Sequence, residues 1–350
     1  MAVETKEQVV PDREELLKRF IESCSQKGLL ARPDSLEERD SAEGLLDQPT
    51  LLRFLTARKF DHDEAIKHFE EVKRFREENQ IIRLYDLVQV ADFENARRLY
   101  FHWTGRRDKK GLPLCFYDLD YLTKDVIAGW EKTRTVAQWK YSQSDTKPPS
   151  PNMLQLAAAY VDSVSRFVIP LCSMMPDRPE KSTPITSSLY LVDATNMGLK
   201  QAWSAKNLIQ DISWLLSTCF PESIDKVLVC NSPSYFPTIW KYLKPYVDPF
   251  TAEKIVFLLR SEVLPTLREY IDDANIPAQF GGAHSFTHGQ LPDLEDEIKK
   301  CLGLQEGTTQ LPPGPIKWIE EADGRKSALA VGSEAGSERN HRVATMDSRQ

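Results

Sequence analysis

The chain has few of the features that mark secreted, membrane-spanning or metal-binding proteins. Its 350 residues include only six cysteines, none of them in a CxxC or another metal-ligand spacing, and residues 1–15 contain no apolar signal-peptide core. Apolar runs such as residues 255–259 fall far short of the roughly 18 residues that indicate a membrane span. These absences predict a soluble, intracellular protein with reduced thiols.

Excess positive charge is also missing. The formal net charge is -7, whereas nucleic-acid-binding domains are usually strongly basic. We therefore expect no nucleic-acid partner, and any contact with a phosphate or a membrane surface has to be local.

The motifs of several enzyme classes are absent too. There is no G-x-S-x-G, and the nearest candidate turn, residues 229–233 with Ser232, lacks both flanking glycines. No phosphate-binding loop or G-x-G-x-x-G follows a predicted strand. His284 and His288 are four residues apart, but in a glycine-rich segment that favours solvated loop histidines over a metal pair. Cys230 is isolated, which is typical of packing. We expect no enzyme activity, no cofactor and no metal.

Composition changes along the chain divide it into five segments. The length and the 41% hydrophobic content predict one main domain with smaller accessories. We expect a flexible N-terminus over 1–12, a helical unit over 13–80, the main domain over 84–284, a C-terminal extension over 285–322 with one acidic helix near 290–305, and a disordered tail over 323–350, which is rich in Ser, Ala, Gly and charge.

Periodicity supports helices in the N-terminal unit and mixed structure after it. Between residues 63 and 78, Ile66, Phe69, Val72 and Phe75 recur at helical spacing. Residues 99–103 and 114–119 flank a basic, glycine-bounded connection and predict a two-stranded element, followed by a long helical region over 124–175.

Three short runs without polar alternation come next, at residues 189–192, 227–230 and 255–259. Strands of this kind are buried on both faces, as in a parallel sheet covered by helices. Residues 205–219 carry one apolar helical face and are long enough for a crossover between the first two strands. The sequence therefore predicts an α/β fold.

A rigid turn precedes the third run. Pro245 and Pro249 fix φ on either side of Asp248, and Thr251 and Lys254 follow one helical turn apart. The aromatic, amphipathic segment 235–247 leads into this turn. Polar groups held beside apolar walls suggest recognition of an amphiphile.

Five pieces of the chain, in order and at compatible spacing, resemble the CRAL-TRIO family and within it the yeast-type phosphatidylinositol/phosphatidylcholine transfer proteins. They are residues 52–61 (LRFLTARKFD), 108–113 (DKKGLP), 220–222 (FPE), 244–254 and 276–282 (IPAQFGG). The resemblance implies a helical N-terminal unit followed by an α/β lobe over 84–284, whose mainly parallel sheet floors a lipid pocket closed by a helical gate.

The resemblance also implies the roles of particular residues. The phosphatidylinositol head group would meet Arg58, Lys59, Glu222, Thr251 and Lys254, where cations offset a phosphate and the carboxylate accepts from inositol hydroxyls or orients a lysine. Each has an ordinary alternative as a helix cap or a solvated turn residue. The gate residues are Phe236, Ile239, Trp240 and Leu243, with covering of the sheet as the alternative role.

The chain departs from the family at the second lipid site. Where relatives that carry phosphatidylcholine have a Ser-x-Thr pair and a tyrosine, this chain has Ser188 with Tyr190, and Cys115. We expect these changes to disturb a choline-phosphate site.

The resulting hypothesis is a monomeric cytoplasmic protein that carries one phosphatidylinositol and exchanges it at intracellular membranes such as Golgi, endosome or endoplasmic reticulum. Lipid kinases would be downstream users of the lipid. Two alternatives stay open: a carrier of a sterol or other neutral hydrophobe, and an α/β hydrolase that uses Ser232.

Overall fold

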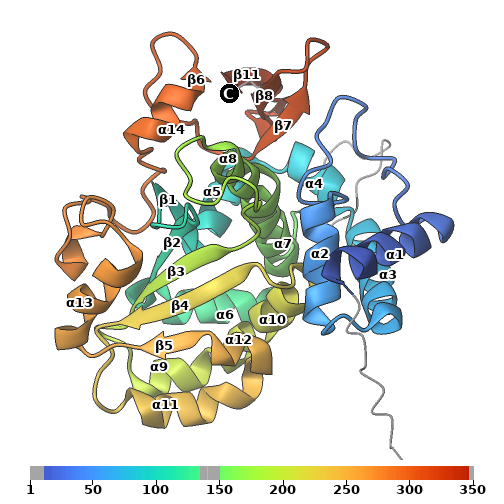
Figure 1. Ribbon diagram of the computed structural model, residues 1–350. Coiled ribbons are helices and arrows are strands. Elements are labelled where there is room, and N and C mark those ends of the chain that lie inside the picture. Colours follow the sequence, from blue (N-terminus) through green and yellow to red (C-terminus); the bar gives the residue numbers. More distant parts are fainter. Residues whose placement is uncertain (1–11, 135–139, 141–149, 347–350) are drawn as a thin grey trace, which may run out of the picture.

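A five-stranded sheet forms the centre of the computed structural model, which describes residues 12–134, 140 and 150–346 (Figure 1). The strand order is β1-β2-β3-β4-β5; β1 is antiparallel to β2, and the other neighbours are parallel. The strands are β1 His102–Arg107, β2 Pro113–Asp118, β3 Ser188–Asp193, β4 Ile224–Cys230 and β5 Ile255–Phe257. The three predicted apolar strands and their parallel pairing are confirmed.

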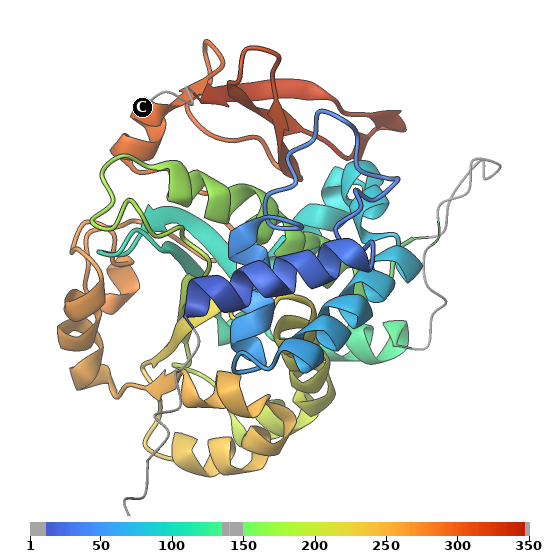
Figure 2. The same ribbon diagram turned by 45° about the vertical axis from the view of Figure 1, so that its right-hand side comes forward.

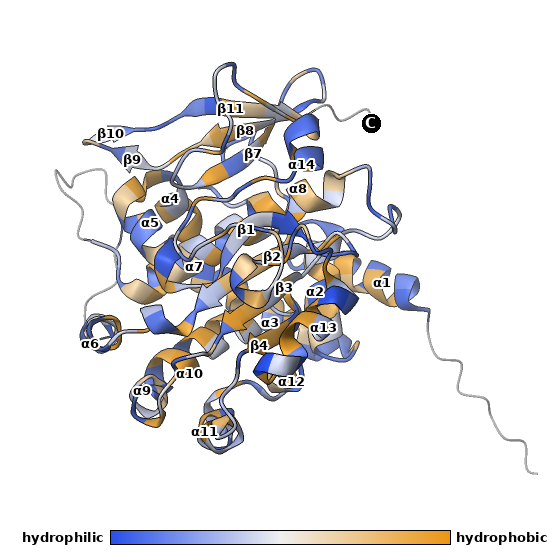
Figure 3. Cartoon of the chain, turned by 90° about the vertical axis from the view of Figure 1, so that its left-hand side faces the viewer, coloured by the Kyte–Doolittle hydropathy of each residue, from blue (hydrophilic) through white to orange (hydrophobic). Residues whose placement is uncertain are grey.

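Alternate residues of these strands enter two different cores. Leu191 and Leu228 pack with Leu267 of α13, Arg260–Tyr270, on one face of the sheet. Tyr190 and Val229 face the other side, where they join the helices of the main core. Because both faces are covered, the strands need no polar alternation. Figure 3 shows the hydrophobic colour concentrated on these central elements.

Five helices precede the sheet. They are α1 Arg13–Gln26, α2 Gln48–Ala57, α3 His62–Glu78, α4 Ile81–Leu87 and α5 Val90–Leu99, and in Figure 2 α1 lies across α2 and α3. Asp61 caps α3 by accepting a hydrogen bond from the Glu64 amide, which satisfies one free donor of the helix terminus. The helical part extends past residue 80 to Leu99, so the strand expected at residues 99–103 begins later, at His102.

The remaining helices connect or cover the strands. They are α6 Lys124–Thr133, α7 Met153–Ser163, α8 Ile169–Met174, α9 Leu199–Ser204, α10 Lys206–Trp214, α11 Phe236–Leu243, α12 Pro249–Glu253 and α14 Asp296–Cys301. Part of the expected helical region, residues 135–139 and 141–149, lies outside the described residues. By length and hydropathy the stretch Met153–Met174 could span a bilayer, but 78% of it is buried inside the protein, as in the core helix of a soluble protein.

The C-terminal residues form a second sheet, so the expectation of a disordered tail over 323–350 is wrong for its described part. Four antiparallel strands follow the order β6-β11-β8-β7, with a small β9-β10 hairpin beside them. Their bounds are β6 Leu302–Leu304, β7 Ile316–Glu320, β8 Lys326–Ala330, β9 Ser333–Glu334, β10 Ser337–Glu338 and β11 His341–Met346. In Figures 1 and 2 this sheet lies over one end of the molecule.

Long-range contacts explain why this polar-looking segment is ordered. Trp318 is 1% exposed, stacks on Phe167 with 5.1 Å between ring centroids, and donates from its indole nitrogen to the Phe167 carbonyl at 3.1 Å. Lys317 is buried between Asp40, 2.9 Å away, and Asp86, 3.1 Å away. The C-terminal sheet is thereby joined to both the core helices and the N-terminal unit.

Candidate functional site

A small polar pocket brings together four of the five residues expected at the head group. Arg58, Glu222, Thr251 and Lys254 all line this pocket, which has about 40 Å³ of free space. They come from the end of α2, the loop before β4, and α12 with its C-terminal cap. The structure therefore assembles in one place residues that lie almost 200 positions apart in the sequence.

Within the pocket, Lys254 and Glu222 form an ion pair. The Lys254 amine donates to the Glu222 carboxylate and to the Ile224 carbonyl, each at 2.8 Å. Both side chains are about a quarter exposed. Glu222 has a positive φ of 54°, a conformation that non-glycine residues seldom adopt and that is often found at functional sites. The carboxylate therefore holds the ammonium group toward the pocket.

Asp248 organises the turn that carries Thr251. Its carboxylate accepts from the Thr251 amide at 3.0 Å and from the Thr251 hydroxyl at 3.2 Å, and Pro249 occupies the first position of α12. A proline at this position after an Asp cap is a common helix start. Asp248 was not among the predicted site residues, although the order Asp-Pro-x-Thr is a recognisable capping signal.

The two basic residues after α2 have different surroundings. Arg58 lines the pocket, and within the described chain its guanidinium has neither an ion-pair partner nor a hydrogen bond. Lys59 does not line the pocket; its amine lies over the exposed ring of Phe250, 5.4 Å from the centroid, as in a cation–π contact. Lys59 and Phe60 both have positive φ, so the chain turns sharply here between α2 and α3.

An apolar cavity of about 220 Å³ adjoins the polar pocket. The two spaces share Leu216, Ile224 and Thr251. The cavity lies between α10 and the face of the sheet that carries Val229, and α11 closes it. An apolar space beside a pocket lined by charged side chains of both signs fits a ligand with a polar head and a hydrocarbon tail.

The expected gate residues hold α11 against the sheet. Phe236, Ile239 and Leu243 are buried, and Trp240 is half-buried. Phe236 and Trp240 contact the ring of Phe257 in β5, with centroids 4.9 and 5.3 Å apart. Phe236, Trp240 and Leu243 line the apolar cavity in this structure.

Sequence reasoning missed the aromatic residues on the outside of the same region. Trp203 of α9 and Tyr242 of α11 are both more than half exposed, and their rings are in edge contact at 6.4 Å. Tyr235 and Leu199 are exposed nearby, and the Lys206 amine lies over the Trp203 ring. An exposed aromatic cluster with lysines is typical of surfaces that contact a lipid interface. Their helical spacing gave no sign of which face would remain uncovered.

The residues of the expected second lipid site are packed into the core. Cys115 and Ser188 are fully buried, and Tyr190 is 6% exposed. The Tyr190 ring is in edge contact with Phe101 at 4.9 Å and belongs to the main hydrophobic cluster. In the described structure the tyrosine ring occupies the space on this face of β3.

The residues that enter the alternative hypotheses show no arrangement for catalysis. The Ser232 hydroxyl donates to the Val229 carbonyl at 2.9 Å, and in the described part of the chain no histidine is bonded to it. Burial raises the pKa of the Cys230 thiol, which disfavours a reactive thiolate. Among the described residues no group of three or more His, Cys, Asp or Glu side chains could hold a metal ion.

His68 connects α3 to the segment that lines the polar pocket. Its ring nitrogen Nε2 contacts the Thr218 carbonyl at 2.8 Å, and its ring packs on Phe54. Burial, reinforced by the nearby Arg58 charge, lowers the pKa of His68 from 6.5 to about 4. The imidazole is therefore neutral in the folded protein at pH 7, and Nε2 is the donor to Thr218.

This burial predicts a specific acid sensitivity. As the pH falls from 6.5 to about 4, His68 gains a proton in the unfolded chain but not in the folded one, so stability is lost over this window and is fully present above it. The loss at pH 4 is expected to be about 2–3 kcal/mol. His68→Gln, whose amide can still donate to Thr218, should reduce the loss of the free energy of unfolding between pH 6.5 and pH 4, measured in urea; the buried His102 and His288 would account for the rest. His341→Gln, an exposed control, should leave it unchanged; equal pH curves for wild type and His68→Gln would contradict the assignment.

The comparisons with known proteins agree with this architecture. Residues 97–282 match the CRAL/TRIO domain, and residues 13–71 match the CRAL/TRIO N-terminal domain. A CRAL-TRIO domain-containing protein of Saccharomyces cerevisiae is 30% identical over 68% of this chain and 71% of its own length. The SEC14 cytosolic factor of Candida glabrata is 28% identical over 74% of this chain and 78% of that protein.

More distant similarities extend over most of the chain. A phosphatidylinositol/phosphatidylcholine transfer protein of Arabidopsis thaliana is 24% identical over 90% of this chain and 73% of its own. The crystal structure of Sfh5 covers 83% of this chain and 96% of its own, with a TM-score of 0.53 at 11% identity, and so supports the fold. The helical N-terminal unit, the mainly parallel sheet and the family matches together show that this chain belongs to the CRAL-TRIO family.

Proposed function

We propose that the protein binds one phosphatidylinositol and exchanges it between membranes. The observation that carries this proposal is the junction of the polar pocket with the apolar cavity through Leu216, Ile224 and Thr251. Arg58 and Lys254 would meet the phosphate, the Thr251 hydroxyl would turn from Asp248 to donate to it, and Glu222 would accept from inositol hydroxyls. The acyl chains would lie beneath α11.

Loading of the lipid requires α11 to move. A cavity of about 220 Å³ is smaller than the 300–1,000 Å³ of ordinary ligand pockets, and a two-chain lipid needs more. α11 leads into the turn from Lys244 to Asp248, where Pro245 and Pro249 restrict the backbone. We therefore infer that α11 opens as a unit about this turn. The outer Trp203–Tyr242 cluster would contact the bilayer in the open form.

The names of related proteins support phosphatidylinositol as the cargo and the cytoplasm as the compartment. The presence of cytosolic factors and of phosphatidylinositol/phosphatidylcholine transfer proteins among the relatives favours a soluble, cytoplasmic carrier without enzymatic activity. The fully buried Cys115 and the packed Tyr190 ring favour exclusion of phosphatidylcholine. The cargo would then be the anionic lipid alone, delivered to membranes where lipid kinases use it.

The test is a competition between lipids for the purified protein. We expect native mass spectrometry, after incubation with vesicles of equal phosphatidylinositol and phosphatidylcholine content, to find one phosphatidylinositol per protein and almost no phosphatidylcholine. Tyr190→Thr removes a ring from the core and restores a hydroxyl, and should allow phosphatidylcholine to be retained. In a transfer assay between vesicles, the wild type should likewise transfer radiolabelled phosphatidylinositol but almost no radiolabelled phosphatidylcholine.

Two results would contradict the proposal. Retention of a sterol or another neutral lipid in place of phosphatidylinositol would favour the alternative cargo, which the apolar lining of the cavity also permits. Equal retention of both phospholipids by the wild type would show that Tyr190 does not block the second lipid.

A further inference from the structure

A second and larger cavity lies within the N-terminal unit. It has a volume of about 520 Å³, and α2, α3, the start of α4, and the segment between α1 and α2 form its walls. None of the described residues that line it also lines the polar pocket or the apolar cavity beneath α11. It is therefore separate from the proposed phosphatidylinositol site.

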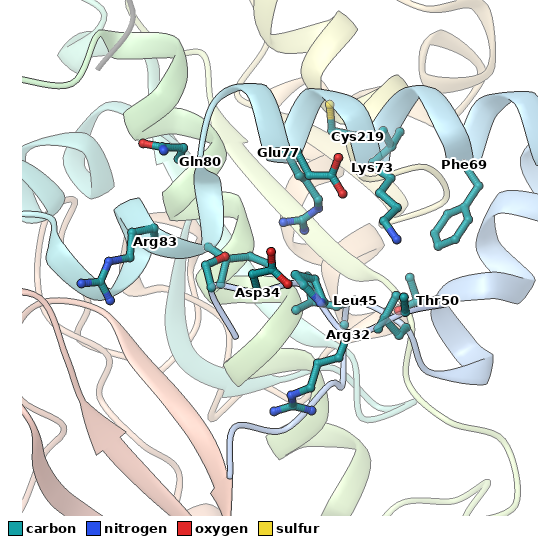
Figure 4. A pocket seen from close by; sticks show the side chains of 18 of the residues that line it. Arg32, Asp34, Leu45, Thr50, Phe69, Lys73, Glu77, Gln80, Arg83 and Cys219 are labelled. Atoms are coloured by element: carbon teal, nitrogen blue, oxygen red, sulfur yellow. The ribbon is translucent and has the colours of Figure 1, made fainter. Parts of the chain in front are cut away.

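The cavity combines apolar walls with an excess of positive charge. Five cationic side chains line it against two acidic ones, in a chain whose net charge is -7. The cations are Arg32, Arg53, Lys73, Arg76 and Arg83, and the acids are Asp34 and Glu77. Figure 4 shows Lys73 and Glu77 extending from α3 into the space that Leu45 and Asp34 border on the opposite side. A local excess of this size attracts an anion.

Arg53 is the most unusual of these cations. It is 6% exposed, and within the described part of the chain its side chain makes one hydrogen bond, from Nη2 to the Thr50 hydroxyl at 3.3 Å. Nη1 is buried without a partner, and among the described residues no carboxylate lies within ion-pair distance. Burial lowers the pKa of Arg53 to about 10, although the more distant Asp47 charge opposes this shift. A buried cation without a close counterion destabilises the folded state.

Arg76, in the same cavity, has the ion pair that is expected of a buried arginine with a structural role. It is paired with the fully buried Asp162 carboxylate, although its Nη1 is also without a partner. A purely structural account of Arg53 would require a similarly close counterion, whereas among the described residues Asp47 and Asp162 act on Arg53 from beyond ion-pair distance. Two adjacent arginines with unpaired nitrogens form the arrangement in which guanidinium groups bind phosphate oxygens.

We propose that this N-terminal cavity binds a phosphate monoester, with Arg53 as its principal ligand and Lys73 and Arg76 in support. The dianion would supply the counterion that Arg53 lacks, and the volume admits a polyol phosphate of about head-group size. The apolar walls would cover the carbon skeleton of the ligand. Such a ligand can arrive as a soluble metabolite or as the head group of a lipid in a membrane.

Thermal unfolding of the full chain tests the soluble source. Glycerol phosphate at a hundredfold excess over its Kd is expected to raise the Tm of the wild type by about 4 °C. Arg53→Met, which is similar in length and has no charge, should lose this shift, while its Tm without ligand should be equal to or higher than that of the wild type. Lys73→Met, at a half-buried position, should weaken the affinity about tenfold and serves as a second variant if Arg53→Met does not fold.

Vesicle sedimentation tests the membrane source. Phosphatidylcholine vesicles doped with phosphatidic acid present the same monoester, and vesicles doped with phosphatidylglycerol present a phosphate diester as a control. Binding that depends on Arg53 and occurs only with the phosphatidic acid vesicles would identify a lipid head group as the ligand. A Tm shift with glycerol phosphate, without binding to these vesicles, would identify a soluble ligand. Lys254→Met should retain both the Tm shift with glycerol phosphate and any binding to phosphatidic acid vesicles, because it alters only the proposed phosphatidylinositol site.

The proposal is overturned if glycerol phosphate shifts the Tm of Arg53→Met as much as that of the wild type. It is also overturned if neither glycerol phosphate nor phosphatidic acid produces an effect that depends on Arg53. Neither result depends on lipid transfer, so this test and the test of phosphatidylinositol exchange can fail separately.

Discussion

Replacement of Trp318 by alanine is expected to lower the free energy of unfolding by about 3–5 kcal/mol. The change removes a fully buried ring from its stack on Phe167 and leaves the Phe167 carbonyl without its indole donor. Phe167 belongs to a π-helical turn, Val164–Val168, that connects α7 to α8. The loss would therefore loosen the contact between the C-terminal sheet and the longest core helix. Urea unfolding followed by circular dichroism measures it.

A matched variant separates this effect from the general loss of a tryptophan. Trp203 is 53% exposed, and Trp203→Ala should change the free energy of unfolding by no more than about 0.5 kcal/mol. If Trp318→Ala is as stable as Trp203→Ala, the C-terminal sheet is not packed on the core in solution.

Replacement of Lys254 by alanine is expected to reduce phosphatidylinositol transfer about 10- to 100-fold. A hydrogen bond to a charged group contributes about 1.5–3 kcal/mol, and each 1.4 kcal/mol is a tenfold change in affinity. The variant also leaves the Glu222 carboxylate without its partner, 2.8 Å away in the wild type, so that it would repel the lipid phosphate. Transfer of radiolabelled lipid between vesicles measures the loss.

Two further variants make this prediction specific. Lys244→Ala removes an exposed lysine from the same turn and should retain nearly full transfer. Adding Glu222→Gln to Lys254→Ala removes the repulsion and should recover part of the lost activity. Wild-type transfer by Lys254→Ala would exclude the polar pocket as the head-group site.

The central fold could be predicted because its strands and helices are marked by patterns within short stretches of sequence. Runs such as residues 189–192 are apolar throughout, and a strand buried on both faces leaves this mark whatever its neighbours are. The helix at residues 63–78 was recognisable from Phe69 and Val72 at helical spacing, and both are buried.

The C-terminal sheet could not be predicted in this way. Its β8 strand, Lys326–Ala330, is short and includes polar residues. The neighbouring β7 depends on partners such as Asp40 and Phe167 that lie far away in the sequence. Local composition carries no information about such partners, so Ser, Ala, Gly and charge indicated disorder where a sheet is formed.

The candidate site was predictable as a set of residues but not in its detail. The resemblance identified Arg58, Glu222, Thr251 and Lys254, which the structure brings together in one pocket. It did not separate Arg58 from Lys59, of which only the first lines the pocket. Lys59 has a positive φ, which is uncommon for lysine, so its residue type gave no sign of this backbone turn.

The ion pairs between Lys317 and the N-terminal unit have a consequence for synthesis of the chain. Asp40 and Lys317 are 277 residues apart in the sequence. Because a ribosome adds about 5–20 residues per second, Lys317 is synthesised on the order of tens of seconds after Asp40. The N-terminal helices therefore pass this interval without their contact to the C-terminal sheet. A chaperone that shields the nascent helices would have that interval in which to act.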